Sequence, residues 1–142
     1  MSSLSAAISA SASALNVQRT RIEVAVSNIA NAESTRGPDG TPYRRRDVVL
    51  APQAMGTFDE ALGQAGAMGV KVDAVVQDDT PFRRRYEPSH PDADASGFVS
   101  LPNIDTPQEM VDMLGAARGY QANLAAIGMI RELVAKALDL GR

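Results

Sequence analysis

Residues 106–142 read TPQEMVDMLGAARGYQANLAAIGMIRELVAKALDLGR, and this stretch decides the fold. Apolar residues recur along it at the seven-residue spacing that keeps one side of a helix facing a partner. The stretch therefore predicts a C-terminal helix of roughly 50 Å, far longer than an average globular helix. The residues assigned to its seam are Met113, Ala117, Tyr120, Leu124, Ile127, Val134 and Leu138.

The start of this helix is marked by Thr106-Pro107-Gln108-Glu109, which has the spacing of a capping box. The Thr106 hydroxyl is expected to accept a hydrogen bond from the backbone N–H of Glu109, while the Glu109 side chain reaches back to the N–H of Thr106. Pro107 then occupies the first helical position, where its missing N–H costs nothing.

A second helix is predicted in residues 1–36, which contain neither proline nor glycine. Its seven-residue repeat is interrupted by Ser11 and Gln18, so the helix is marginal alone and must meet the other helix or other chains. The residues assigned to this seam are Ile8, Leu15, Ile22 and Ile29.

The middle of the chain, residues 37–105, reads as short strands and turns. All eight prolines lie between Pro38 and Pro107. Residues 51–69 carry four glycines and are predicted to form a mobile loop. The predicted fold is thus mainly α with a small β insert, whose two long terminal helices form an antiparallel coiled-coil-like pair. The strand candidates are 47–50, 70–76, 82–86 and 98–101.

Composition excludes several classes of protein. The absence of cysteine excludes disulfides, thiolate catalysis and iron–sulfur clusters, and the net charge of −3 argues against a strongly basic nucleic-acid binder. The sequence contains no run of about 20 apolar residues, so no membrane span is predicted. Met1 to Gln18 lack the basic region that begins a signal peptide, so no cleaved signal peptide is expected.

Two arginine runs, 44–46 and 83–85, lie beside aromatic residues and are candidates for phosphate contacts with a nucleic acid. The alternative is an ion-paired strand face, which the nearby Asp47 and Glu87 and the negative net charge favour.

Residues 92–97, DADASG, begin like an EF-hand calcium loop. Asn103 stands where the bidentate glutamate belongs, so an Asx-type turn leading into the next strand is the favoured interpretation. His90, the only histidine, lies in no metal-binding or catalytic motif. The residues alone therefore favour a non-enzymatic structural or interaction protein with no catalytic residue, metal or cofactor.

Three stretches resemble the bacterial flagellar basal-body rod protein family. SNIANAEST (27–35) is similar to the N-terminal motif of flagellar axial proteins in general. EPSHPDADASGFV (87–99) with LPNID (101–105) resembles the middle motif of the proximal-rod member in particular, and EMVDM (109–113) with ARGYQAN (117–123) resembles its C-terminal helix. The chain departs from the family pattern at residues 36–40 and at Glu87. Another axial protein remains the alternative.

The resemblance implies a structural subunit of the rod that transmits motor torque. It further implies export through the flagellar type III apparatus without cleavage, a periplasmic location in the basal body, and helical assembly with copies of itself and other rod proteins. The paired terminal helices would form the inner layer of the tube. The family-motif residues carried over are Asn28, Asn31, Thr35, Tyr120, Gln121 and Asn123.

Three of these motif residues are asparagines that lie in the predicted helices: Asn28, Asn31 and Asn123. Two roles are open for them. They either select helix register, as a buried asparagine does in coiled coils, or they cap or solvate the helix ends.

Overall fold

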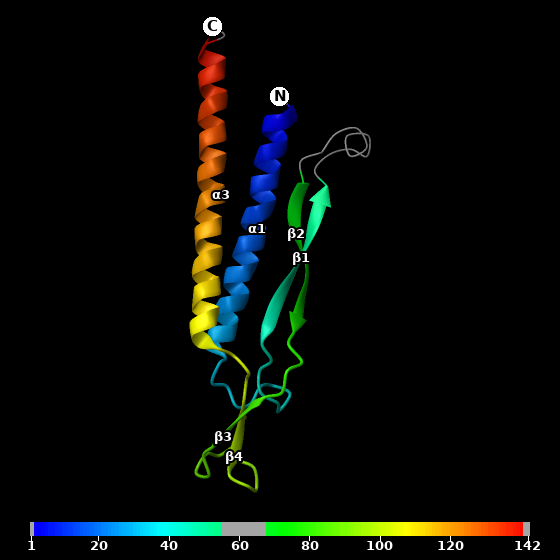
Figure 1. The fold of residues 1–142 in the computed structure, drawn as a ribbon, viewed down its shortest axis with the longest axis vertical. Helices are drawn as coiled ribbons and strands as arrows, with labels where there is room; N and C mark the ends of the chain where they lie inside the picture. Colours follow the sequence, from blue (N-terminus) through cyan, green and yellow to red (C-terminus); the bar gives the residue numbers. More distant parts are fainter. Residues whose placement is uncertain (1, 55–67, 141–142) are drawn as a thin grey trace.

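The computed structural model describes residues 2–54 and 68–140. Two long helices flank a small antiparallel β region, which confirms the predicted fold class (Figure 1). In chain order the elements are α1 (Ser2–Ala30), β1 (Arg46–Ala54), β2 (Met68–Gln77), β3 (Arg83–Tyr86), β4 (Phe98–Leu101) and α3 (Thr106–Leu140).

The helices run antiparallel, as predicted, and are closest where α1 ends and α3 begins (Figure 1). Asn28 of α1 bonds Glu109 of α3, and ten residues further along each helix Gln18 packs against Gly119. In this register Ser2 lies level with Ala135. The last turn of α3 therefore extends past the first residue of α1, as Figure 1 shows.

Short-range hydrogen bonds cap the C-terminal end of α1 and the N-terminal end of α3. Asn31, just after α1, donates from its backbone N and from its side-chain Nδ2 to the carbonyl of Ser27. At the start of α3 the backbone N of Glu109 donates to the carbonyl of Asp105 at 3.0 Å, which makes Asp105 the N-cap residue. The predicted capping box is therefore wrong, because the N-cap is Asp105, one residue before Thr106. The Glu109 carboxylate bonds Asn28 and Arg45 instead, because it faces α1.

In the described residues the strands form two separate two-stranded sheets. β1 pairs with β2 from Arg46↔Gln77 to Ala54↔Met68, with an irregularity between Val49 and Leu50. β3 pairs with β4 from Arg83↔Leu101 to Tyr86↔Phe98. The β1–β2 hairpin lies along α1, so that α1 runs between the hairpin and α3 (Figure 1).

The hairpin extends further than the sequence predicted. Residues 51–54 continue β1 and residues 68–69 begin β2, so these parts of the predicted loop 51–69 are strand. Pro52 is tolerated because β1 has a partner on one edge only. Residues 55–67, the remainder of that loop, lie outside the described residues.

The apolar core is small, and its members come from α1, α3, β4 and the segments that follow α1 and β4. Because few large side chains are buried within one chain, the fold gains little hydrophobic stabilisation from its own contacts. The buried apolar residues in the described part of the chain are Val17, Ala25, Ala32, Val99, Leu101, Ile104 and Ala116.

Gly97 tests how tightly the turn before β4 is built. Its φ is +80°, and an added Cβ would lie 2.8 Å from the Tyr86 ring and 3.2 Å from Pro88 Cβ. Gly40 is the matched control, because its φ is +76° but its Cβ would meet open space. We expect Gly40→Ala to lower the free energy of unfolding by about 1–2 kcal/mol, the cost of a left-handed backbone, and Gly97→Ala to lower it further. Urea unfolding followed by tyrosine fluorescence measures both, and equal effects would contradict the contact with Tyr86.

Candidate assembly interface

The predicted seam of α1 is only partly covered within one chain. Its four members, Ile8, Leu15, Ile22 and Ile29, are all half-buried. The deepest positions of α1 are instead Val17, Ala25 and Asn28. The reason is that α1 packs against two neighbours, α3 on one side and the β1–β2 hairpin on the other. Small side chains allow these close approaches, and a repeat of large residues does not reveal them.

The predicted seam of α3 divides into two groups. Met113, Ala117, Tyr120 and Ile127 are half-buried. Leu124, Val134 and Leu138 are exposed, Leu124 to 55% and Leu138 to 68%. The helix is therefore only partly covered in the single chain, and the assignment of all seven residues to an assembly interface stays a prediction.

A second apolar stripe on α3 was missed by the sequence analysis. Val111 and Met129 are five full turns apart and so share a face, and Val111 points about 140° away from the buried Ala116. A repeat of four and three residues connects Val111 to Met129, but it passes through glycine, arginine and alanine at 115, 118, 122 and 125 and so gave no clear apolar signal. Exposed large residues outside the predicted seam of α3 are Met110, Val111, Leu114, Met129, Leu133 and Leu140.

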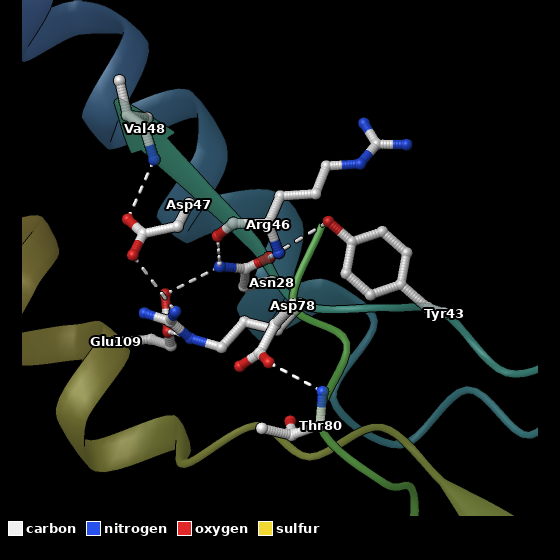
Figure 2. A network of polar contacts seen from close by, with 9 residues as sticks. Asn28, Tyr43, Arg46, Asp47, Val48, Asp78, Thr80 and Glu109 are labelled. Atoms are coloured by element: carbon white, nitrogen blue, oxygen red, sulfur yellow. Dashed lines mark hydrogen bonds and ion pairs between the residues drawn. The ribbon is translucent and has the colours of Figure 1, made fainter. Parts of the chain in front are cut away.

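Asn28 is the centre of a buried polar network at the base of the helix pair, where α1 ends and α3 begins (Figure 2). Its side chain is 1% exposed. Nδ2 donates to the Arg46 carbonyl and to Glu109 Oε2, both at 2.9 Å. Oδ1 accepts from the Arg46 backbone N and from the Tyr43 hydroxyl, both at 3.0 Å. All four hydrogen-bonding positions of the amide are thus used, which ties α1, β1 and α3 together.

Glu109 completes this network from α3. It is 3% exposed, and Oε1 accepts from Arg45 Nε at 2.6 Å. Arg45 also lies 3.5 Å from Asp47. Burial by itself would lower the pKa of Arg45, but the hydrogen bond to Glu109 and the charges of Glu109 and Asp47 outweigh burial and raise it above its ordinary value. The arginine therefore stays charged and neutralises the buried carboxylate.

A polar cavity of about 610 Å³ adjoins the network. Arg21 and Asp112 line it from the two helices, and Arg46 and Asp78 line it from the hairpin. No cluster of acidic or histidine side chains suited to a metal ion occurs in residues 2–54 and 68–140.

The remaining family-motif residues occupy different places. Asn31, just after α1, and Asn123, within α3, each donate from the side chain to the backbone carbonyl four residues earlier, at 2.8 Å. Thr35 donates to Asp92 at 2.7 Å and so joins the end of the N-terminal motif to the loop before β4. Tyr120 is half-buried and Gln121 is exposed. Among the described residues, Asn28 is the one of the three asparagines whose side chain bonds other elements.

The arginine runs lie against intramolecular partners. Arg45 bonds Glu109, Arg84 bonds Asp94, and Arg85 lies between Glu33 and Glu87 at 3.3 and 2.8 Å. Arg44 stacks over Phe82, Arg46 over Tyr43 and Arg84 over Phe98. The ion pairs of Arg45, Arg84 and Arg85 agree with the ion-paired interpretation for these three arginines.

The loop at residues 92–97 forms the predicted Asx-type turn. Asp94 Oδ1 accepts from the backbone N of Ser96 at 2.8 Å and of Phe98 at 3.0 Å. The other carboxylate oxygen of Asp94 bonds Arg84. His90 belongs to the same turn, where Nδ1 accepts from the backbone N of Asp92 at 3.1 Å. The carboxylates that suggested a calcium loop thus have partners in the protein.

Asp94 makes the stability of this turn depend on pH. The N–H of Phe98, aided by the N–H of Ser96 and by Arg84, lowers the pKa of Asp94 below its ordinary value. A lowered pKa in the folded state adds stability that is present above pH of about 4 and is lost as the pH falls through the folded value.

We therefore expect Asp94→Ala to destabilise the protein at neutral pH and to lose this effect in acid. Asp94→Asn is the control, because it retains an acceptor for the two N–H groups but has no charge to titrate. Urea unfolding across pH 3–8 measures both variants. A deficit of Asp94→Ala that is equally large at every pH would contradict the assigned role of the carboxylate.

Two family models match the two ends of the chain. Residues 8–38 match the flagella basal body rod protein model, and residues 95–140 match the flagellar basal body rod FlgEFG protein C-terminal model. Within the described residues, no helix has the length and apolar character needed to cross a membrane.

Named relatives cover almost the whole chain. It is 45% identical over 130 residues to flagellar basal-body rod protein FlgC of Salmonella typhimurium, across 92% of each protein. Identity to FlgC of Bacillus subtilis is 40% over 146 residues, across 95% of this chain and 96% of the relative. Identity to FlgC of Borreliella burgdorferi is 36% over 151 residues, across 96% and 97%. The likeness runs through both helices and the β region between them, and the chain belongs to the FlgC family of flagellar basal-body rod proteins.

Proposed function

We propose that this chain polymerises through the apolar surfaces that its two terminal helices leave exposed, and that the polymer is part of the proximal shaft that transmits motor torque. As a member of the FlgC family it is a structural subunit of the flagellar basal-body rod. The observation that carries the proposal is the exposure of large apolar side chains along α3, on both sides of its contact with α1.

An apolar helix surface of this extent needs partners. A helix that carries large apolar residues on more than one side needs other elements to cover them. In the single chain Leu133, Leu138 and Leu140 are 61%, 68% and 90% exposed. Each additional 100 Å² of apolar surface covered by a neighbour contributes roughly 2.5 kcal/mol. Contacts repeated between many copies therefore supply the stabilisation that the small core of one chain does not.

Two glycines of α3 support close packing against neighbours. An added Cβ at Gly115 or Gly128 would meet nothing within 4 Å in the single chain. A glycine inside a helix costs about 1 kcal/mol relative to alanine. In the described part of the chain no neighbour packs against these two positions, so the backbone of a neighbouring subunit would have room to approach. Densely packed helices resist torsion, as a shaft requires.

The partners follow from this role. We propose contacts with further copies of this chain and with other rod proteins, a periplasmic position in the basal body, and delivery by the flagellar export apparatus without a cleaved signal peptide. The assignment involves no catalytic step and no cofactor.

Leu124→Asp tests the assembly surface. Because Leu124 is 55% exposed, the change costs the single chain little, but it places a carboxylate in the proposed interface, where burial of an unpaired charge is strongly unfavourable. We expect loss of swimming in soft agar with normal amounts of exported protein. Ile22→Asp, on the predicted seam of α1, is expected to act in the same way.

Lys71→Asp is the matched control for this test, since it places the same side chain at an exposed position of β2. It should leave motility unchanged. Normal swimming of a strain that carries Leu124→Asp as its only copy would refute the proposed surface.

A further inference from the structure

We propose that Asn28 and Glu109 are positioning residues that fix the register of the helix pair at its base and hold that base together before assembly. This proposal concerns the single chain alone.

Burial along the helices is concentrated at the base. In α1 the buried residues are Val17, Ala25 and Asn28, and in α3 they are Glu109 and Ala116. Among residues 4–16 none is buried. Isolated helical turns are marginal in water and depend on packing for their stability. The base is therefore the part of the pair that one chain can stabilise, and the ends are the part that it cannot.

The amide of Asn28 permits one arrangement of the three elements. Its Nδ2 donates to the backbone carbonyl of Arg46, and its Oδ1 accepts from the backbone N–H of the same residue. A neighbouring β-strand would form the same pair of hydrogen bonds. Its second donor hydrogen bonds Glu109 and its second acceptor site bonds Tyr43. A shift of either helix by one turn, about 5.4 Å, would break several of these bonds at once.

The Glu109 carboxylate makes such a shift costly. It is buried with Arg45 and Asn28 as its side-chain partners, which lie 64 and 81 residues away in the sequence. A buried charge that loses its partner is strongly destabilising, whereas the intact pair is only weakly stabilising. The network thus acts mainly by excluding other registers, as a polar residue does in the seam of a coiled coil.

Hydrogen exchange of the dilute full-length chain tests the proposal. We expect slow exchange of backbone amides in residues 20–30 and 107–117, and fast exchange in residues 4–14 and 128–140. Asn28→Ala should accelerate exchange at the base at least tenfold in both helices. Asn123→Ala is the matched control, because that amide bonds only its own helix, and it should leave the base unchanged.

Asn28→Asp supplies a signature that a general loss of folding would not produce. The new side chain has the same shape but places a second carboxylate against Glu109. The other charged groups at the base are Arg45, Asp47 and Asp78, and Tyr43 is a further hydrogen-bond partner. Two carboxylates at such a distance share a proton, so the pKa of one is strongly raised. Protection at the base should be lost at neutral pH and restored as the pH falls below that raised value.

Unchanged protection of the base in Asn28→Ala, or loss in Asn28→Asp that acid does not reverse, would overturn the role of the network. Equally slow exchange along the whole of both helices in the wild-type chain would contradict the concentration of stability at the base. Neither result bears on whether Leu124→Asp blocks the rod, so failure of the proposed function remains distinguishable.

Discussion

The architecture depends on one constraint, a carboxylate that is buried at the point where three segments meet. The Glu109 carboxylate has its two side-chain partners only when α1 places Asn28 and the segment before β1 places Arg45 beside it. Hydrogen bonds to charged groups are among the stronger ones in proteins, and a lost partner costs more than an intact bond contributes. The apolar core around this point is small, so polar geometry rather than hydrophobic burial specifies how helices and hairpin are arranged.

The distribution of apolar surface is that of a component rather than a self-sufficient globule. Large aliphatic side chains lie outside on α3, while several of the buried positions are filled by alanine. A stable monomer would place these large residues in its own core. In the assembly proposed above they would be covered by neighbouring subunits, in keeping with the family to which the chain belongs.

Much of the fold was accessible from the sequence, because its signals are local. The absence of proline and glycine from residues 1–36, the start signal of α3 near residue 106 and the Asx turn at Asp94 each depend on neighbouring residues. The structure confirms the two helices and the turn. The network was not accessible in this way. Asn28 and Glu109 are separated by 81 residues, and nothing near either one identifies the other. The capping box failed for the same reason, since a long-range partner engaged the Glu109 side chain.

The hairpin lies on one side of α1 and α3 lies on the other, which gives the subunit two unlike faces (Figure 1). When identical subunits bind through two unlike faces, the rotation between neighbours need not produce a closed ring. Each added subunit then presents the same free face to the next one. Such a stack has a direction. A polymer of this kind grows with a defined polarity, and its two ends present different chemistry to whatever they join.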